Sequence, residues 1–328
     1  MSGGRAAPDA SGIASAQASA ARLDWIDVAR GIGIIAVVVG HVWTRGAVRE
    51  FLYTFHMPLF FLLSGYLMQP RPAWRFARRQ VATQGLSYVA WLIVLLAVDF
   101  AVEGLKGQRP IFHNWPDDLG RVAFGGSELR GPFTVFWFVP CLIVARIIAN
   151  ALACRWGDPR GYAWWGIAAG AALLAYVSGG MTDVSPLGLL TVPMALVLLW
   201  IGWLWRDMAW RPWMRAVLAA VGFGIVLVAP PLNMKAGDYG WPVLSITAAV
   251  AISLLVFRVA QAALPGRRML RALGSAALTI VYLHVAIIHY LTPYLGKWML
   301  LALALGVPMG MHWLLKRNRL TARLLLGV

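Results

Sequence analysis

The chain alternates long apolar runs with short polar connections, and this pattern predicts its architecture. About ten runs are long enough to cross a bilayer as helices. A backbone in lipid must satisfy its own hydrogen bonds, and these runs lack the strict alternation of barrel strands. We therefore expect an all-α polytopic membrane protein of about ten transmembrane helices. The predicted spans are approximately 26–44, 51–68, 81–101, 133–153, 162–178, 186–205, 213–230, 242–262, 272–291 and 297–315.

Two polar ends flank the predicted membrane domain, which covers residues 23–316. Residues 1–22 are rich in Ala, Ser and Gly and lack the apolar core of a signal peptide, so we expect a disordered cytoplasmic tail. Residues 317–328 should form a short basic cytoplasmic tail. The spans 162–178 and 186–205 are joined by SGGMTDVSP, a connection that also fits a re-entrant hairpin.

The basic residues indicate how the predicted helices are oriented. Most Lys and Arg lie at the two ends and on alternate connections, and the remaining connections carry few. Because cytoplasmic loops are enriched in Lys and Arg, we expect both termini in the cytoplasm. The long connection 102–132 then lies outside, and it is our candidate for a lid or an acceptor-contacting segment.

Composition removes several other classes of protein. Of 328 residues, 60% are hydrophobic and only 13% are charged, which is too little charge for the surface of a soluble protein. The net charge is +16, and the basic residues behind it lie in short connections between apolar runs, which is a signal of membrane topology. We therefore expect a lipid bilayer and not nucleic acid as the partner. Cys141 and Cys154 fall at opposite ends of one predicted helix, too far apart for a disulfide. No Cys and His spacing predicts a metal site.

Three ionisable residues lie within the first two apolar runs: Arg30, His41 and His56. Arg30 and His41 are eleven positions apart, so they share one helix face within about 20° and stand about 16 Å apart along the axis. Ionisable groups inside a membrane are costly and are functional candidates by default. The alternative is structural, with Arg30 an anchor paired with Asp27 and His41 a capped polar group. The predicted topology also places His284 in the same outer layer.

Four sequence segments resemble the acyltransferase-3 family of integral membrane acyltransferases. Arg30-x10-His41 is followed by FHMPLFFLLSG (55–65), and FWFVPCL (136–142) and GSAALTIVYLH (274–284) match in order and spacing. The opening DWIDVARGIGIIAVVVGH (24–41) is similar to the fucose-O-acetylase-like branch. The resemblance implies an enzyme of a bacterial inner membrane. It would transfer an acyl group, expected to be acetyl, to a sugar hydroxyl of a surface polysaccharide, glycolipid or periplasmic glycan. The donor would be acetyl-CoA acting as a co-substrate, with no bound cofactor.

The resemblance and the predicted layering together suggest roles for the candidate residues. His41 would accept the hydroxyl proton directly or become acylated and relay the group; both routes remain open. His56 would hydrogen-bond the thioester oxyanion or the acceptor, or serve as a polar contact between helices. The expected acceptor or supporting residues are Trp137, Tyr282 and His284.

A basic cytoplasmic rim is our candidate for binding the phosphates of acyl-CoA, because Arg pairs with phosphate in a bidentate fork. The rim consists of Arg71, Arg75, Arg78, Arg79, Arg267, Arg268 and Arg271. The expected donor-binding residues are Arg30, oriented by Asp27, and Arg75, Arg78 and Arg79 of the connection 69–80. The alternative is that this rim only sets topology. Gly31, Gly33, Gly40 and Gly65 are expected to allow close helix packing.

Two other classes of function compete with this interpretation. A secondary transporter also has many helices and charged residues along a pathway. Against it, we find no internal repeat, and acidic residues are confined to helix ends such as Asp99. A non-catalytic polysaccharide-assembly protein is the other alternative, and the intact set of Arg30, His41 and His56 argues against it.

Overall fold

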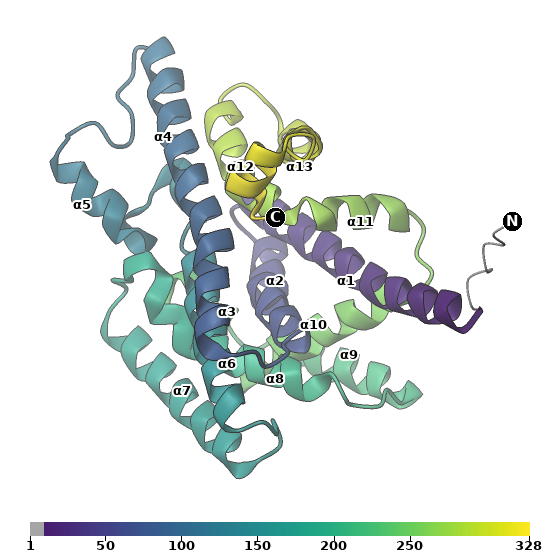
Figure 1. The fold of residues 1–328 in the computed structure, drawn as a ribbon. Coiled ribbons are helices and arrows are strands. Elements are labelled where there is room, and N and C mark those ends of the chain that lie inside the picture. Colours follow the sequence, from purple (N-terminus) through teal and green to yellow (C-terminus); the bar gives the residue numbers. More distant parts are fainter. Residues whose placement is uncertain (1–9) are drawn as a thin grey trace, which may run out of the picture.

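The protein is helical throughout the part that the computed structural model describes, residues 10–328 (Figure 1). No strand occurs within this range, where an isolated bridge joins Asn233 and Asp238. The all-α prediction is therefore confirmed. The α-helices are α1 (Ala10–Val42), α2 (Ala47–Tyr66), α3 (Ala73–Gln80), α4 (Leu86–Leu105), α5 (Asp117–Phe124), α6 (Phe138–Arg155), α7 (Tyr162–Met181), α8 (Val192–Trp205), α9 (Pro212–Val226), α10 (Leu244–Gln261), α11 (Arg267–Ser275), α12 (Ala277–Leu291), α13 (Lys297–Leu315) and α14 (Arg319–Thr321).

Shorter helical segments complete the chain. Two are π-helices, in which each backbone hydrogen bond spans five residues instead of four and the turn is wider: η1 (Val81–Gly85) and η6 (Ala322–Leu326). The others are 3₁₀ turns: η2 (Gly126–Glu128), η3 (Gly131–Phe133), η4 (Pro186–Thr191) and η5 (Met234–Ala236). The segment η1 joins α3 to α4 without a break, so the three form one long run.

Seven helical spans among the described residues are long and apolar enough to cross a membrane, or eight if α11 and α12 count as one. The chain is therefore a multi-pass membrane protein. Both α7 and the η4–α8 run pass this test, in the region where a re-entrant hairpin was an alternative. The other two predicted spans correspond to α9, which has only 15 residues, and α2, which begins with charged residues. Every predicted run contains a helix, and the number of about ten crossings stays a prediction.

The predicted span 272–291 is wrong at its start, because the chain bends by 82° between α11 and α12. Contact with α1 explains the bend. An added Cβ at Gly274 of α11 would lie 1.8 Å from the carbonyl oxygen of Asp27, and one at Gly31 would lie 2.0 Å from that of Leu270. The two backbones therefore touch, and α11 lies against α1 over much of its length (Figure 1).

A second close contact joins α2 to α8. An added Cβ at Gly65 would lie 1.9 Å from the carbonyl oxygen of Leu199, and one at Gly202 would lie 2.0 Å from that of Leu62. Each helix thus presents a glycine to the backbone of the other, which is how membrane helices approach closely. The expected packing role is confirmed for Gly65 and, through α11, for Gly31.

The ends of the chain differ from simple tails. In the structure α1 begins at Ala10, within the predicted N-terminal tail. Residues 1–9 lie outside the described residues, and the predicted disorder of the tail stays a prediction. At the other end, η6 packs against α4. Ser87 Oγ and Trp91 Nε1 both donate to the carbonyl oxygen of Leu325, at 2.7 and 2.8 Å. This segment is therefore fixed to the helical body.

Candidate functional site

A cavity of about 340 Å³ brings together three of the predicted histidines. It lies at the end of the bundle where α1 ends and α2 begins, and we call it the histidine cavity. Parts of α1, α2, α6 and α12 form its walls, and the connection between α9 and α10 closes one side. Its lining residues are Val37, His41, Arg49, Tyr53, His56, Met57, Phe60, Thr134, Val135, Trp137, Phe138, Leu232, Asn233, Met234, Lys235, Val281 and His284.

Two of the histidines are held rigidly by their own helices. His56 Nδ1 donates to the carbonyl oxygen of Leu52, and His284 Nδ1 donates to that of Ile280, each at 2.7 Å. Both rings are buried, and the Nε2 atom of His284 has no partner among the described residues. A neutral imidazole that donates through Nδ1 accepts through Nε2. In this state His56 accepts a proton or a hydrogen bond, and does not donate one to an oxyanion.

His41 differs from the other two histidines because it forms no hydrogen bond with another described side chain or carbonyl. Its ring centroid lies 5.0 Å from that of His284 in an edge-to-face arrangement. It is half-buried, and it also lines a neighbouring pocket of about 330 Å³ with His289. A ring without a fixed partner, open on two sides, is suited to exchanging protons with a substrate.

Basic and aromatic side chains form the outer part of the cavity. The ring of Tyr53 contacts His56, with 4.7 Å between the centroids, and the Arg49 guanidinium lies 4.1 Å from the centre of the Tyr53 ring. Across the cavity, Lys235 Nζ donates to the Thr134 hydroxyl. Burial lowers the pKa of the Lys235 ammonium. The connection carrying it is fixed by Thr191, whose hydroxyl donates to the carbonyl oxygen of Met234 at 2.6 Å.

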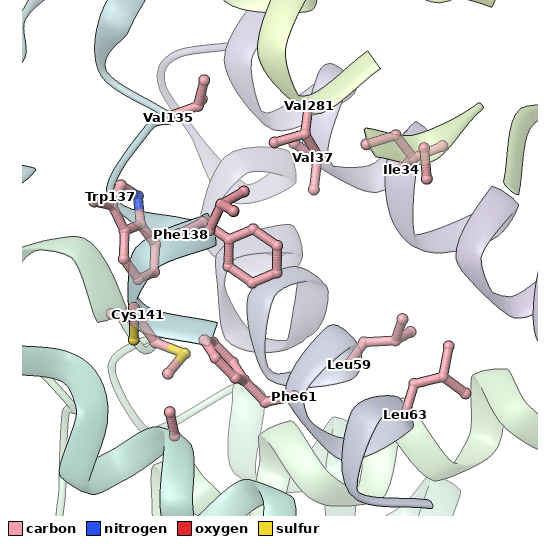
Figure 2. Close-up of a cluster of buried hydrophobic side chains, with 14 of the residues drawn as sticks. Ile34, Val37, Leu59, Phe61, Leu63, Val135, Trp137, Phe138, Cys141 and Val281 are labelled. Carbon is pink, nitrogen blue, oxygen red and sulfur yellow. The ribbon is translucent and has the colours of Figure 1, made fainter. Parts of the chain in front are cut away.

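The apolar wall of the cavity comes from the four helices α1, α2, α6 and α12. Figure 2 shows Phe138 of α6 extending toward α2, with Val37 and Val281 close to each other on their own helices. The predicted acceptor residue Trp137 lines the cavity, at the start of α6. Tyr282 does not line it. Its ring is fully buried against Phe136, with 5.0 Å between the centroids, so it supports the wall from behind.

A second cavity, of about 400 Å³, opens at the opposite end of α2, and we call it the arginine pocket. Arg71, Arg79 and Arg146 line it, together with Gln80, Thr83 and Gln84 around the π-helix η1. Asn150 of α6 fixes its rim, because its side chain accepts from the backbone N–H of Arg71 and donates to the carbonyl oxygen, at 2.9 and 2.8 Å. Three guanidinium groups facing one space suit a polyanionic ligand.

The predicted donor-binding residues do not all reach this pocket. Arg75, Arg78 and Arg79 are all exposed, and of them Arg79 lines the pocket, whereas Arg75 and Arg78 are not part of its wall. Arg30 pairs with Asp27 at 3.1 Å within α1, and neither residue lines one of the two cavities. The ion pair is common to both interpretations of Arg30, a structural anchor and a donor contact oriented by Asp27. Contact of Arg30 with a donor stays a prediction.

The two cavities approach each other from opposite ends of the bundle. On α2, Phe60 lines the histidine cavity and Ser64 lines the arginine pocket. On α12, Val281 lines the first and Leu278 the second. These residues are three or four positions apart, so the partition is about one helical turn thick, or about 4.5–6 Å.

Sequence reasoning missed three charged residues of these cavities. These are Arg49, Lys235 and Arg146, for which the sequence pattern predicts no role in a site. Arg49 and Lys235 lie in connections between predicted spans, and Arg146 lies inside the predicted span 133–153. The available signal was the cost of burying a cation in a membrane helix, which applied to Arg146 as much as to Arg30. His312 is also buried, and its Nδ1 atom lies 3.3 Å from the Thr279 hydroxyl. Among the described residues, no cluster of His, Cys, Asp and Glu could hold a metal.

Comparison with protein families identifies the class of protein that carries this pair of cavities. A family model described as an acyltransferase domain matches residues 23–315, nearly the whole helical body. The chain belongs to the acyltransferase-3 family and is a membrane acyltransferase. Comparison with curated proteins and with solved structures found no match.

Proposed function

We propose that the protein transfers an acyl group, acetyl in the simplest case, from cytoplasmic acyl-CoA to a sugar hydroxyl on the other side of a bacterial inner membrane. The acceptor would belong to a surface polysaccharide, a glycolipid or a periplasmic glycan. The observation that carries the proposal is the pair of cavities separated by about one helical turn, one containing arginines and the other histidines. This arrangement allows donor and acceptor to meet without either crossing the membrane.

The arginine pocket would bind the donor. Acyl-CoA carries phosphates, and Arg71, Arg79 and Arg146 offer planar guanidinium groups that pair with phosphate oxygens. The pantetheine arm is thin and long, so it would extend from this pocket through the partition and place its thioester near the histidines. In this proposal Arg30 contacts the donor from α1, and Arg75 and Arg78 contribute positive charge at the entrance of the arginine pocket.

The histidine cavity would perform the chemistry. A ring nitrogen of His41 takes the proton of the acceptor hydroxyl while the oxygen attacks the thioester carbon. The new C–O ester bond forms, the C–S bond breaks, and the CoA thiolate leaves and receives the proton from His41. His284, whose ring contacts His41, would stabilise its position, and His56 would accept a hydrogen bond from the acceptor. An acyl-histidine relay through His41 is consistent with the same geometry.

The decisive variant is His41→Gln, tested with purified protein in proteoliposomes. Glutamine forms hydrogen bonds but does not accept a proton, and removing a general base typically lowers the rate by about 10²–10⁴. We expect acyl transfer to disappear while the protein folds and binds CoA as before. The control is His113→Gln, because His113 lies in an exposed connection and lines neither cavity. If His41→Gln retains most of the transfer, the proposed base is wrong.

A further inference from the structure

The outer part of the histidine cavity contains two cations that no acidic side chain balances. Arg49 reaches it from the first turn of α2, and Lys235 reaches it from the connection between α9 and α10. No Asp or Glu lines the cavity, and none of the ion pairs in the described part of the chain includes Arg49 or Lys235. The two residues are 186 positions apart, so the fold and not a local charge cluster brings them together.

Both cations are held in position by neutral groups. The Thr134 hydroxyl accepts from Lys235 Nζ, and the Tyr53 ring lies under the Arg49 guanidinium. Neither partner neutralises a charge. Burial also lowers the pKa of the Lys235 ammonium, so the charged state is costly there without a counterion. A bound anion would supply the missing charge and recover that cost.

The position of the pair relates it to the acceptor and not to the donor. Three other arginines already line the pocket at the opposite end, where the donor phosphates would bind. Arg49 contacts Tyr53, whose ring contacts His56, so Arg49 stands one side chain away from His56, and Lys235 lines the same cavity. A group held by Arg49 and Lys235 would therefore belong to the molecule whose hydroxyl meets His41.

We propose that Arg49 and Lys235 form an anion site that selects an acidic acceptor, a sugar bearing a carboxylate or a phosphate beside the hydroxyl to be acylated. This inference rests on the proposed acyltransferase reaction. It adds the class of the acceptor, which the family match does not supply. The anion is bound by charge and hydrogen bonds and does not take part in the bond changes.

The test compares matched acceptors in proteoliposomes supplied with acetyl-CoA. Methyl β-glucuronide and methyl β-glucoside have the same ring hydroxyls and differ in a carboxylate, and glucose 6-phosphate tests a phosphate at the same position. We expect the wild type to prefer one of the two anionic sugars. Lys235→Gln should reduce kcat/KM for that sugar about ten- to a hundredfold, since hydrogen bonds to charged groups have this strength, and should reduce kcat/KM for the glucoside much less. Lys235→Arg should retain most of the preference.

Two controls and a binding measurement make the outcome decisive. Lys297→Gln and Arg45→Gln remove exposed cations that do not line the cavity, and both should keep the wild-type preference. The shift of the unfolding midpoint by glucuronide, compared with the glucoside, measures binding without turnover. Stabilisation that Lys235→Gln abolishes supports the anion site even if no acyl transfer occurs, in which case the proposed function alone fails.

The anion site would be refuted by equal use of neutral and acidic sugars by the wild type, with no selective stabilisation by either anion. It would also be refuted if Lys235→Gln lowered kcat equally for all three sugars. That result would assign Lys235 to the thioester oxyanion, which every acceptor shares.

Discussion

Adding a single methyl group at Gly65 should force α2 and α8 apart. The new Cβ would lie 1.9 Å from the Leu199 carbonyl oxygen, and ordinary contact begins at 3.4 Å, so the gap to be opened is about 1.5 Å. The obstructing atoms are backbone, and no flexible side chain is available to move aside. Overpacking of this kind costs up to about 3 kcal/mol, offset by about 1 kcal/mol for replacing glycine by alanine within a helix. We expect Gly65→Ala to lose about 2 kcal/mol of stability.

The assay is the free energy of unfolding in mixed micelles, with Gly170→Ala as the matched control. An added Cβ at Gly170 of α7 meets no atom within 4 Å, so that variant should gain about 0.5–1 kcal/mol. Gly202→Ala should behave like Gly65→Ala. The double variant should lose less than the two single losses combined, because the first change already separates the helices. Equal stability of Gly65→Ala and Gly170→Ala would refute the direct contact of the two backbones.

The remaining predictions concern the arginine pocket and the topology. Arg79→Gln should raise the acyl-CoA concentration needed for half-maximal transfer, whereas the neighbouring exposed Arg78→Gln should change it little; equal effects would assign the rim to topology. Asn150→Leu removes the side-chain acceptor of the Arg71 N–H at the rim of the arginine pocket, while Cys154 Sγ still donates to the Arg71 carbonyl oxygen, so it should cost about 1 kcal/mol and weaken CoA binding in a calorimetric titration. Leu119→Cys, in a background with Cys154→Ala, should react with an impermeant reagent added outside intact cells, and labelling only after permeabilisation would reverse the orientation.

The sequence predicted the helical class and the histidine layer because both depend on short-range patterns. An apolar run of membrane length must form a helix, and topology then assigns His41, His56 and His284 to one depth. The cavity in fact contains all three. Depth does not determine which side of a helix a residue faces. For that reason Trp137 lines the cavity while Tyr282, on the motif that also supplies His284, lies behind its wall.

Features that depend on contacts between distant segments were not predictable. The 82° bend between α11 and α12 depends on the backbone of α1, more than 200 residues earlier in the chain. Lys235 enters the cavity only because its connection is fixed by Thr191. A local pattern also does not show that Arg79 lines the arginine pocket and Arg78 does not. Adjacent positions on one helix face different directions, and only contacts with other segments determine which direction faces the pocket. Such residues are identified by the walls they form and not by their spacing.

The bend between α11 and α12 makes the thickness of the surrounding bilayer relevant to catalysis. With its first part turned aside, α12 keeps 15 residues, a length of about 22 Å against a hydrocarbon core of about 30 Å. Most of α12 is buried in the protein, but α9 is equally short, is largely exposed, and leads into the connection that closes the histidine cavity. Lipids next to short helices thin at a modest cost for each ångström of mismatch. Such thinning would lower the headgroup layer toward the histidine cavity and shorten the path of a hydrophilic sugar to His41, so longer lipid chains would lengthen that path and slow the enzyme.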